Sequence, residues 1–271
     1  MAASIRRADI LSLSNLRNDG RKPNEIRRMK VQIGPLSPSS TVGGSAIVEM
    51  GLTVALATVR GPLECARRSD EMGDRAIVDV SVKMSPFASA ADRRVTNPNT
   101  DRRLIEAAGM LQKAMEAAIL LQLYPRTRIE ISVVILADDG GRLCAAINAA
   151  TLALQDAGIP MKDFVCACSA GYATDGNSDT TLVDLNRREE SSSGGQPAVQ
   201  LPCAMLPQRG TVVFAQCEAR LPNYRALEKV MEAAMDGCRA VFDIMQEAVR
   251  EKATEVFAVR SGHAQIVDSF S

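Results

Sequence analysis

Two carboxylates, Asp184 and Glu190, lie six residues apart in the run DLNRREE, directly after a predicted strand. This spacing can bring both side chains together across a turn, where a carboxylate pair can hold Mg²⁺ or act as a general acid. A charged run behind a strand is more commonly a solvated loop. The pair therefore indicates a metal or catalytic site only in combination with other features.

The run Asp139-Gly140-Gly141-Arg142 leads into a predicted helix. Glycines allow backbone N–H groups to approach an anion, and the start of a helix favours negative charge. The run indicates a phosphate loop, with a purely structural strand-to-helix turn as the alternative.

Paired arginines occur at three places in the N-terminal half of the chain. The pairs are Arg67-Arg68, Arg93-Arg94 and Arg102-Arg103. Guanidinium groups suit phosphate contacts, whereas surface solubility is the alternative explanation. The chain has six Phe, three Tyr and no Trp, and no aromatic residues alternate with the arginines. The pairs therefore indicate contacts to a phosphate backbone rather than stacking on bases.

The elements that must position these residues follow an α+β pattern. In the first half, β-branched and alternating runs predict strands over 45–50, 52–59, 75–84 and 129–137. Apolar residues at helical spacing predict a helix that begins near Arg102, behind Thr100 or Asp101 as N-cap, and stops before Pro125. A small apolar helix over 143–157 follows, closed by Gly158. In the second half we expect strands over 164–172, 181–185, 198–205 and 211–219. One long helix, or a pair of helices broken at Gly237, completes the chain over 223–258.

Composition narrows the class of protein. The chain has 271 residues, 46% hydrophobic and 24% charged, with 32 basic and 32 acidic residues. It has no apolar run of the roughly 20 residues that span a bilayer and no secretory h-region. The seven cysteines lie mostly in apolar segments, which predicts reduced core residues in an intracellular protein. The single histidine, His263, lies near the C-terminus, which argues against histidine-based catalysis.

Taken in order, these residues resemble the RNase PH family from about residue 15 to about residue 258. The matching stretches are 16–21, 25–28, 61–62, 101–103 with Glu106, 139–141, 148–154, 156–171 and 184–190. The long stretch 156–171, DAGIPMKDFVCACSAG, favours a ring subunit of the exosome over the bacterial enzyme.

The resemblance implies an N-terminal extension over 1–20 and a ribosomal-S5-domain-2-like part over 21–160. An RNase PH C-terminal domain follows over 161–260, with a loose tail over 261–271. Six such subunits form a ring around a channel for single-stranded RNA. Further implied partners are S1/KH-type cap subunits and an associated hydrolytic nuclease, with no membrane. The implied locations are the nucleus, the nucleolus and the cytoplasm.

The resemblance also implies roles for individual residues. Active members cleave RNA from the 3′ end with inorganic phosphate, assisted by a carboxylate site for Mg²⁺ or proton transfer. By position, Asp184 matches the first catalytic aspartate of the family, and Glu190 matches the second carboxylate. The glycine pair and the arginine pairs match the family's residues that bind phosphate and RNA. The phosphate group is Arg102, Arg103, Gly140, Gly141 and Arg142, and the channel group is Arg67, Arg68, Arg93 and Arg94.

Two departures from the pattern predict that phosphorolysis is lost. Active members have Thr or Ser followed by a phosphate-binding Arg after the glycine pair, whereas this chain has Arg142-Leu143. Its arginine comes one position early and is expected to point elsewhere, and Leu143 offers no donor. Glu190 stands where active members have Asp, and misplacing a carboxylate by about 1 Å can cost on the order of 100-fold in rate. Phosphate and Mg²⁺ are therefore expected only if the chain is active.

Two alternatives stay open from the sequence. The chain could be an active phosphate-dependent 3′-to-5′ exoribonuclease within such a ring. It could also be a self-assembling bacterial-type enzyme that matures tRNA ends, against which the stretch 156–171 and the altered loop argue.

Overall fold

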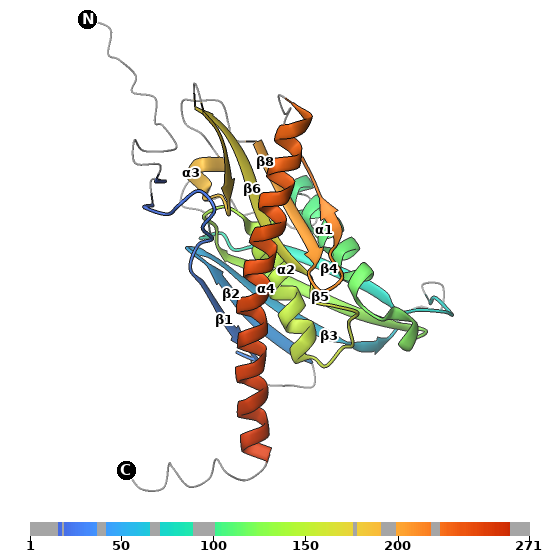
Figure 1. Ribbon diagram of the computed structural model, residues 1–271. Helices are drawn as coiled ribbons and strands as arrows, with labels where there is room; N and C mark the ends of the chain where they lie inside the picture. The colour runs from blue at the N-terminus through green and yellow to red at the C-terminus, as the bar shows by residue number, and fades with distance from the viewer. Residues whose placement is uncertain are drawn as a thin grey trace, which may run out of the picture.

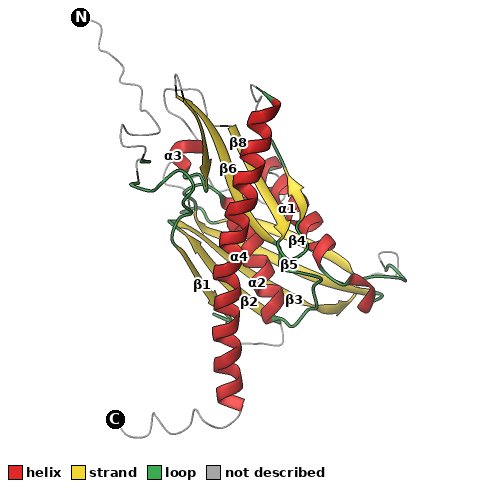
Figure 2. Ribbon diagram, viewed as in Figure 1, coloured by secondary structure: helices red, strands yellow, loops and turns green. Residues whose placement is uncertain are grey.

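The structure is a computed structural model of the whole chain. It describes residues 16–17, 19–36, 42–65, 71–88, 101–175, 178–190, 199–217 and 223–260. These residues form two sheets with helices between and across them (Figures 1 and 2).

The first sheet has five strands in the order β1-β2-β3-β5-β4. Its strands are β1 Met29–Ile33, β2 Gly44–Met50, β3 Thr53–Glu64, β4 Ile77–Met84 and β5 Thr127–Ala137. Neighbouring strands are antiparallel except β4 and β5, which are parallel. That parallel pair needs a crossover, and helix α1, Arg102–Ala118, supplies it, followed by a 3₁₀ turn over Leu121–Leu123. The Asp101 side chain accepts a hydrogen bond from the Arg103 N–H and so caps α1, as predicted.

The second sheet has four antiparallel strands in the order β7-β6-β8-β9. They are β6 Cys166–Asp175, β7 Ser178–Val183, β8 Val199–Leu206 and β9 Thr211–Ala215. Helix α3, Arg187–Glu190, follows β7 as a single turn. Helix α4, Tyr224–Arg260, runs across β6, β7 and β8 and reaches β1 of the first sheet (Figure 1).

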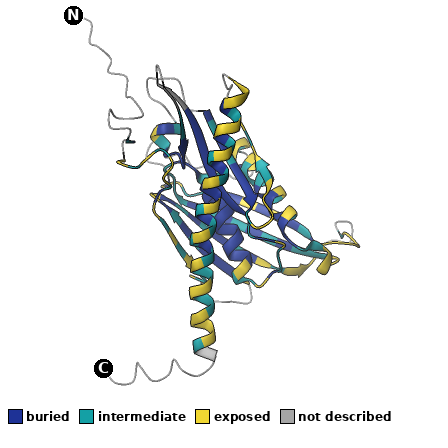
Figure 3. Ribbon diagram, viewed as in Figure 1, coloured by how far each residue is buried: buried dark blue, intermediate teal, exposed yellow. Residues whose placement is uncertain are grey.

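Helix α2, Arg142–Asp156, packs against β2 and β3 of one sheet and β6 of the other. Every residue from Cys144 to Leu154 is buried, which explains why this helix lacks a polar face (Figure 3). The Asn148 side chain pairs with the backbone of Ala167 in β6, donating to its carbonyl at 3.0 Å and accepting from its N–H at 2.8 Å. This pairing satisfies a buried amide and ties the second sheet to α2.

One large hydrophobic core includes residues of both sheets and of α1, α2 and α4. A smaller core lies between the first half of α4 and the outer ends of β6 and β8. Since the larger core is continuous, the domain boundaries stay predictions. None of the helices in the described part of the chain is both long and apolar enough to span a membrane.

Most predicted elements are confirmed, and four differ. Strand β1 was not predicted, β3 continues into the expected loop as far as Glu64, α3 replaces a loop, and β9 ends at Ala215, earlier than predicted. Of the two alternatives for the C-terminal segment, the structure shows one helix, α4, continuous through Gly237. All seven cysteines are free, and five of them are buried, whereas Cys65 is half-buried and Cys217 is exposed.

Gly237 is required by packing rather than by a bend. A Cβ atom at this position would lie 2.7 Å from both the Cys168 sulfur and the Val183 Cγ1. The absence of a side chain therefore allows α4 to sit directly on β6 and β7.

We expect Gly237→Ala to destabilise the protein by about 1–3 kcal/mol, because the added methyl overpacks this contact. Gly109→Ala is the matched control, since Gly109 lies in α1 and a Cβ atom added there would meet nothing within 4 Å. The control should be stabilised by roughly 0.5–1 kcal/mol through helix propensity. Urea unfolding of both variants measures the difference, and equal shifts in the two would contradict the packing argument.

Candidate functional site

The strand-to-helix turn between β5 and α2 depends on its two glycines. Gly140 and Gly141 have φ values of 89° and 65°, in the left-handed region that favours glycine. A Cβ on Gly140 would lie 2.6 Å from the backbone nitrogen of Arg187. The turn therefore packs backbone to backbone against the segment after β7, which carries the predicted carboxylates.

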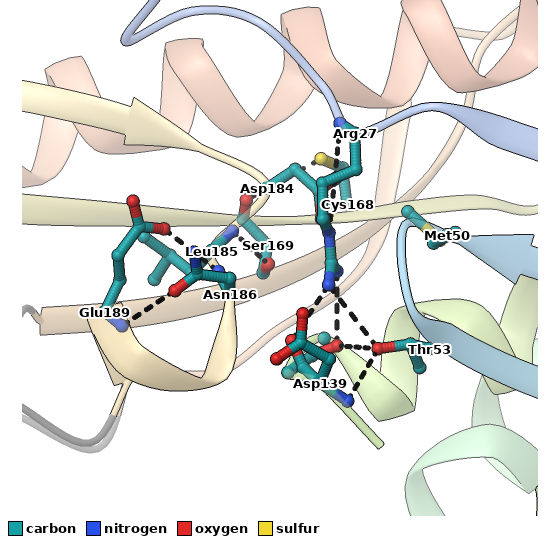
Figure 4. A network of polar contacts seen from close by, with 12 residues as sticks. Arg27, Met50, Thr53, Asp139, Cys168, Ser169, Asp184, Leu185, Asn186 and Glu189 are labelled. Carbon is teal, nitrogen blue, oxygen red and sulfur yellow. Dashed lines mark hydrogen bonds and ion pairs between the residues drawn. The ribbon is translucent and has the colours of Figure 1, made fainter. Parts of the chain in front are cut away.

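The segment after β7 is built around a reciprocal cap. The Asn186 side chain accepts from the Glu189 N–H at 2.9 Å, and the Glu189 carboxylate accepts from the Asn186 N–H at 2.9 Å (Figure 4). This is a capping box with Asn186 as N-cap, and it starts α3 at Arg187. Asp184 itself has φ 55°, in the left-handed region that residues other than glycine rarely adopt. The cap orients Glu190, at the end of α3, toward the glycine turn.

A buried ion pair between Arg27 and Asp184 lies at the centre of the site (Figure 4). Arg27 donates to Asp184 from its backbone N–H at 2.8 Å, from Nε at 3.0 Å and from Nη2 at 2.8 Å. The two side chains are 5% and 1% exposed. Burial alone would lower the pKa of Arg27, but the hydrogen bonds and charge of Asp184 outweigh that effect and raise it.

The same guanidinium also holds the glycine turn. It donates to the carbonyl of Asp139 at 2.9 Å and to that of Gly140 at 3.2 Å. The Thr53 hydroxyl donates to the Gly140 carbonyl at 2.7 Å and accepts from the Asp139 N–H at 3.0 Å. Arg27 and Thr53 together attach the turn to the N-terminal segment and to the start of β3.

Two more arginines of the N-terminal segment reach the same place. Arg17 and Arg21 each donate to the backbone carbonyl of Asp184 at 3.2 Å. Arg17 is 2% exposed, and its Nε lies 3.7 Å from the Glu189 carboxylate. Burial lowers the pKa of Arg17, with the charge of Glu189 opposing that shift. The N-terminal segment therefore holds Asp184 and the start of the segment after β7 in position.

A pocket of about 500 Å³ opens above the glycine turn. It lies between α1, the start of α2 and the faces of β6 and β8 that point away from α4. Its lining includes Arg103, Glu106, Gly141, Arg142, Leu143, Ser169, Glu190, Gln200 and Gln216. Glu190 accepts a hydrogen bond from the Gly141 N–H at 2.8 Å. Burial raises the pKa of Glu190, with the Gly141 hydrogen bond acting in the opposite direction.

The pocket unites four of the predicted site residues: Arg103, Gly141, Arg142 and Glu190. Arg142 is one of the residues that line the pocket, and its guanidinium lies 3.7 Å from the carboxylate of Asp138, which is outside the lining. Leu143 also lines the pocket, and its side chain carries no hydrogen-bond donor.

The other predicted residues have different positions. Asp184 does not line the pocket and forms the buried ion pair with Arg27. The carbonyl of Gly140 accepts hydrogen bonds from Arg27 and Thr53. The side chain of Arg102 is 89% exposed and pairs with Glu106 at 2.7 Å. The channel residues Arg67, Arg68, Arg93 and Arg94 lie outside the described residues.

The carboxylates as placed do not fit a magnesium site. Both oxygens of Asp184 accept hydrogen bonds from Arg27, and Glu190 is bound to the Gly141 N–H. Across the described ranges, no three His, Cys, Asp or Glu side chains converge as metal ligands.

Sequence reasoning missed Arg27, Thr53 and Arg17 as members of the site. Arg27 lies 157 residues from its partner, and no local pattern distinguishes it from the exposed Arg28 beside it. The sequence did contain one indication of the two arginines: stretches 16–21 and 25–28 match the RNase PH family although they contain few apolar residues that a core would require.

Comparison with known proteins agrees with this architecture. Residues 25–160 match the family model described as "3′ exoribonuclease family, domain 1" of the RNase PH type. The chain belongs to the RNase PH family.

Relatives within the RNase PH family extend the match to nearly the whole chain. The human exosome complex component RRP41 is 41% identical over 248 residues, covering 91% of this chain and 96% of the relative. The Rrp41 of the archaeon Thermococcus kodakarensis is 39% identical over 236 residues, covering 87% and 89%. These matches confirm the expected family and its exosome branch.

Solved structures support the RNase PH fold. Rice Rrp46 superposes with a TM-score of 0.70 at 24% identity, covering 85% of this chain and 98% of that one. A chain of the Archaeoglobus fulgidus exosome, solved with RNA bound to the active site, gives a TM-score of 0.67 at 23% identity, covering 85% and 92%.

We expect Arg27→Ala to cost this RNase PH chain about 3–5 kcal/mol of unfolding free energy, because it leaves Asp184 buried without its counter-charge. Adding Asp184→Ala to that variant should recover part of the loss, since the two residues act as a pair. Urea unfolding of the single and double variants measures this coupling. Arg102→Ala is the control, because its exposed ion pair should leave stability unchanged. Strictly additive losses would show that the pair does not hold the site.

Proposed function

We propose that this chain is a core ring subunit of a eukaryotic-type exosome, which threads single-stranded RNA for 3′-to-5′ processing and degradation. Similarity to exosome RRP41 components over about nine-tenths of the chain supports ring membership. The proposal includes other RNase PH-like subunits as neighbours, cap subunits of the S1/KH type and an associated hydrolytic nuclease. It also places the protein in the nucleus, nucleolus and cytoplasm.

We further propose that the subunit has no phosphorolytic activity of its own. The observation that carries this is Leu143, an apolar side chain in the pocket wall where phosphorolysis needs a cationic donor. The neighbouring Arg142 comes one position earlier, and the Asp138 carboxylate 3.7 Å from its guanidinium competes with an anion for it.

An active phosphorolytic exoribonuclease is the second candidate. It is favoured by the pocket itself, which keeps Arg103 beside the glycine turn. The two candidates differ in the products that the assembled complex releases from RNA.

We expect the assembled complex to release no nucleoside diphosphates from a 3′ single-stranded RNA when inorganic phosphate is supplied. Chromatography of the products distinguishes diphosphates, formed with phosphate, from monophosphates, formed by a hydrolytic nuclease. The triple variant R142T/L143R/E190D restores the pattern of active relatives, and we expect it to release measurable diphosphate. Phosphate-dependent diphosphate release by the unmodified chain would establish the active alternative.

The channel assignment rests on Arg67, Arg68, Arg93 and Arg94. Arginines that line a ring's pore would meet the RNA backbone through charge rather than base identity. For single strands, the logarithm of affinity falls with the logarithm of salt by about 0.7 per neutralised phosphate.

We expect Arg67→Glu with Arg68→Glu to weaken RNA threading for all sequences alike and to flatten its salt dependence. The measurement is the length of single-stranded RNA that the assembled complex protects from an added nuclease at several salt concentrations. Exchange of Arg239 for Glu is the control, because that exposed residue on α4 forms a local ion pair with Asp236, one turn earlier in the helix. If the double variant protects the same length with the same salt slope, these arginines are ordinary surface residues.

A further inference from the structure

The N–H group of Gly141 is already occupied in this chain. Gly141 is the N-cap of α2, a helix of 15 residues, and its N–H donates to Oε1 of Glu190 at 2.8 Å. The first N–H groups of a helix have no partner within the helix and attract negative charge. Here that position faces a pocket whose wall also carries Arg103 and Arg142.

We propose that Glu190 is an internal anion that occupies the glycine turn in place of a dissociable oxyanion such as phosphate. The carboxylate is part of the chain, so it acts as a tethered competitor for the Gly141 N–H. This inference rests on the proposed loss of phosphorolysis, which it explains in part. The hydrogen bond between Glu190 and Gly141 is observed whether or not that proposal holds.

The backbone beneath Glu190 is fixed from three sides, which makes the competitor effective. The Glu190 N–H donates to the Asn186 carbonyl at 2.9 Å, and the capping box of Asn186 and Glu189 holds the rest of the turn. Arg17 lies against Glu189 from the N-terminal segment. A group held this close has a high effective concentration, so a free anion must displace it at a cost in apparent affinity.

The length of the side chain decides whether this contact can form. With the backbone of α3 fixed, an aspartate at position 190 would hold its carboxylate one carbon–carbon bond, about 1.5 Å, further back. A carboxylate withdrawn by that distance from a 2.8 Å contact lies outside hydrogen-bonding range. Glutamate therefore covers the Gly141 N–H, and aspartate would leave it open.

The test uses inorganic phosphate as the probe and the full chain, co-purified with ring neighbours if it requires them. Phosphate binding to the unmodified chain, Glu190→Ala and Glu190→Asp is measured by isothermal titration at constant ionic strength. We expect both variants to bind phosphate about tenfold or more tightly than the unmodified chain. Each leaves the Gly141 N–H free to donate a charge-assisted hydrogen bond to the phosphate. Glu190→Gln keeps an oxygen acceptor over the N–H, so it should bind phosphate more weakly than Glu190→Ala.

Glu106→Gln is the matched control. It removes one negative charge from the same pocket wall, but Glu106 pairs with Arg102 and does not contact Gly141. We expect its phosphate affinity to change by at most about twofold, since exposed charges are screened. A gain in this control equal to that of Glu190→Ala would show that only net charge matters and would overturn the inference.

Circular dichroism confirms that each variant is folded before its binding is interpreted. The inference is overturned if folded Glu190→Ala and Glu190→Asp bind phosphate no better than the unmodified chain. The proposed function fails by a different result, namely diphosphate release by the unmodified complex. A variant that gains phosphate binding without gaining phosphorolysis supports the inference and leaves Leu143 as the remaining obstacle to catalysis.

Discussion

The site depends on a single buried guanidinium. Arg27 contacts three separate parts of the chain: the carboxylate of Asp184, the carbonyls of the glycine turn and the hydroxyl of Thr53. Removing two charges from water is costly, and the cost is recovered only when nearly every donor and acceptor finds a partner. Arg27 meets that condition with five different acceptor atoms, so the turn and the segment after β7 have little freedom to move independently. The position of Glu190 over the turn follows from this constraint.

The helices supply the geometry that the ion pair then secures. Because α2 is buried between the two sheets, its N-terminus has a fixed position relative to both of them. Strand β7 ends on the same side, so the carboxylates after it meet the start of α2. Helix α4 covers the opposite face of the second sheet, which leaves the pocket face open to α1. The arrangement explains how residues 49 positions apart in the chain, Gly141 and Glu190, come to share a hydrogen bond.

Local patterns were sufficient to predict most of the elements. The mainly apolar run 143–157 with Gly158 behind it predicted α2, and alternating residues predicted β4, because burial follows the period of each element. Gly237 left a continuous and a broken helix both open, since a glycine within a helix marks either a break or a close contact, and only the neighbouring strands decide between them. The three-dimensional site was less predictable. The sequence indicated the glycine turn and the carboxylates, but Arg27 resembles any surface arginine until Asp184 is placed beside it.

The ion pair at the centre of the site also constrains how the chain can fold during its synthesis. Arg27 leaves the ribosome 157 residues ahead of Asp184. At about 5–20 residues per second, the arginine waits roughly 8–30 s for its counter-charge. During that interval the first sheet can pair its strands, but Arg27 must stay hydrated, because burying it alone is too costly. The N-terminal half therefore completes its folding only when the second sheet arrives, and the two halves of this chain mature together rather than in succession.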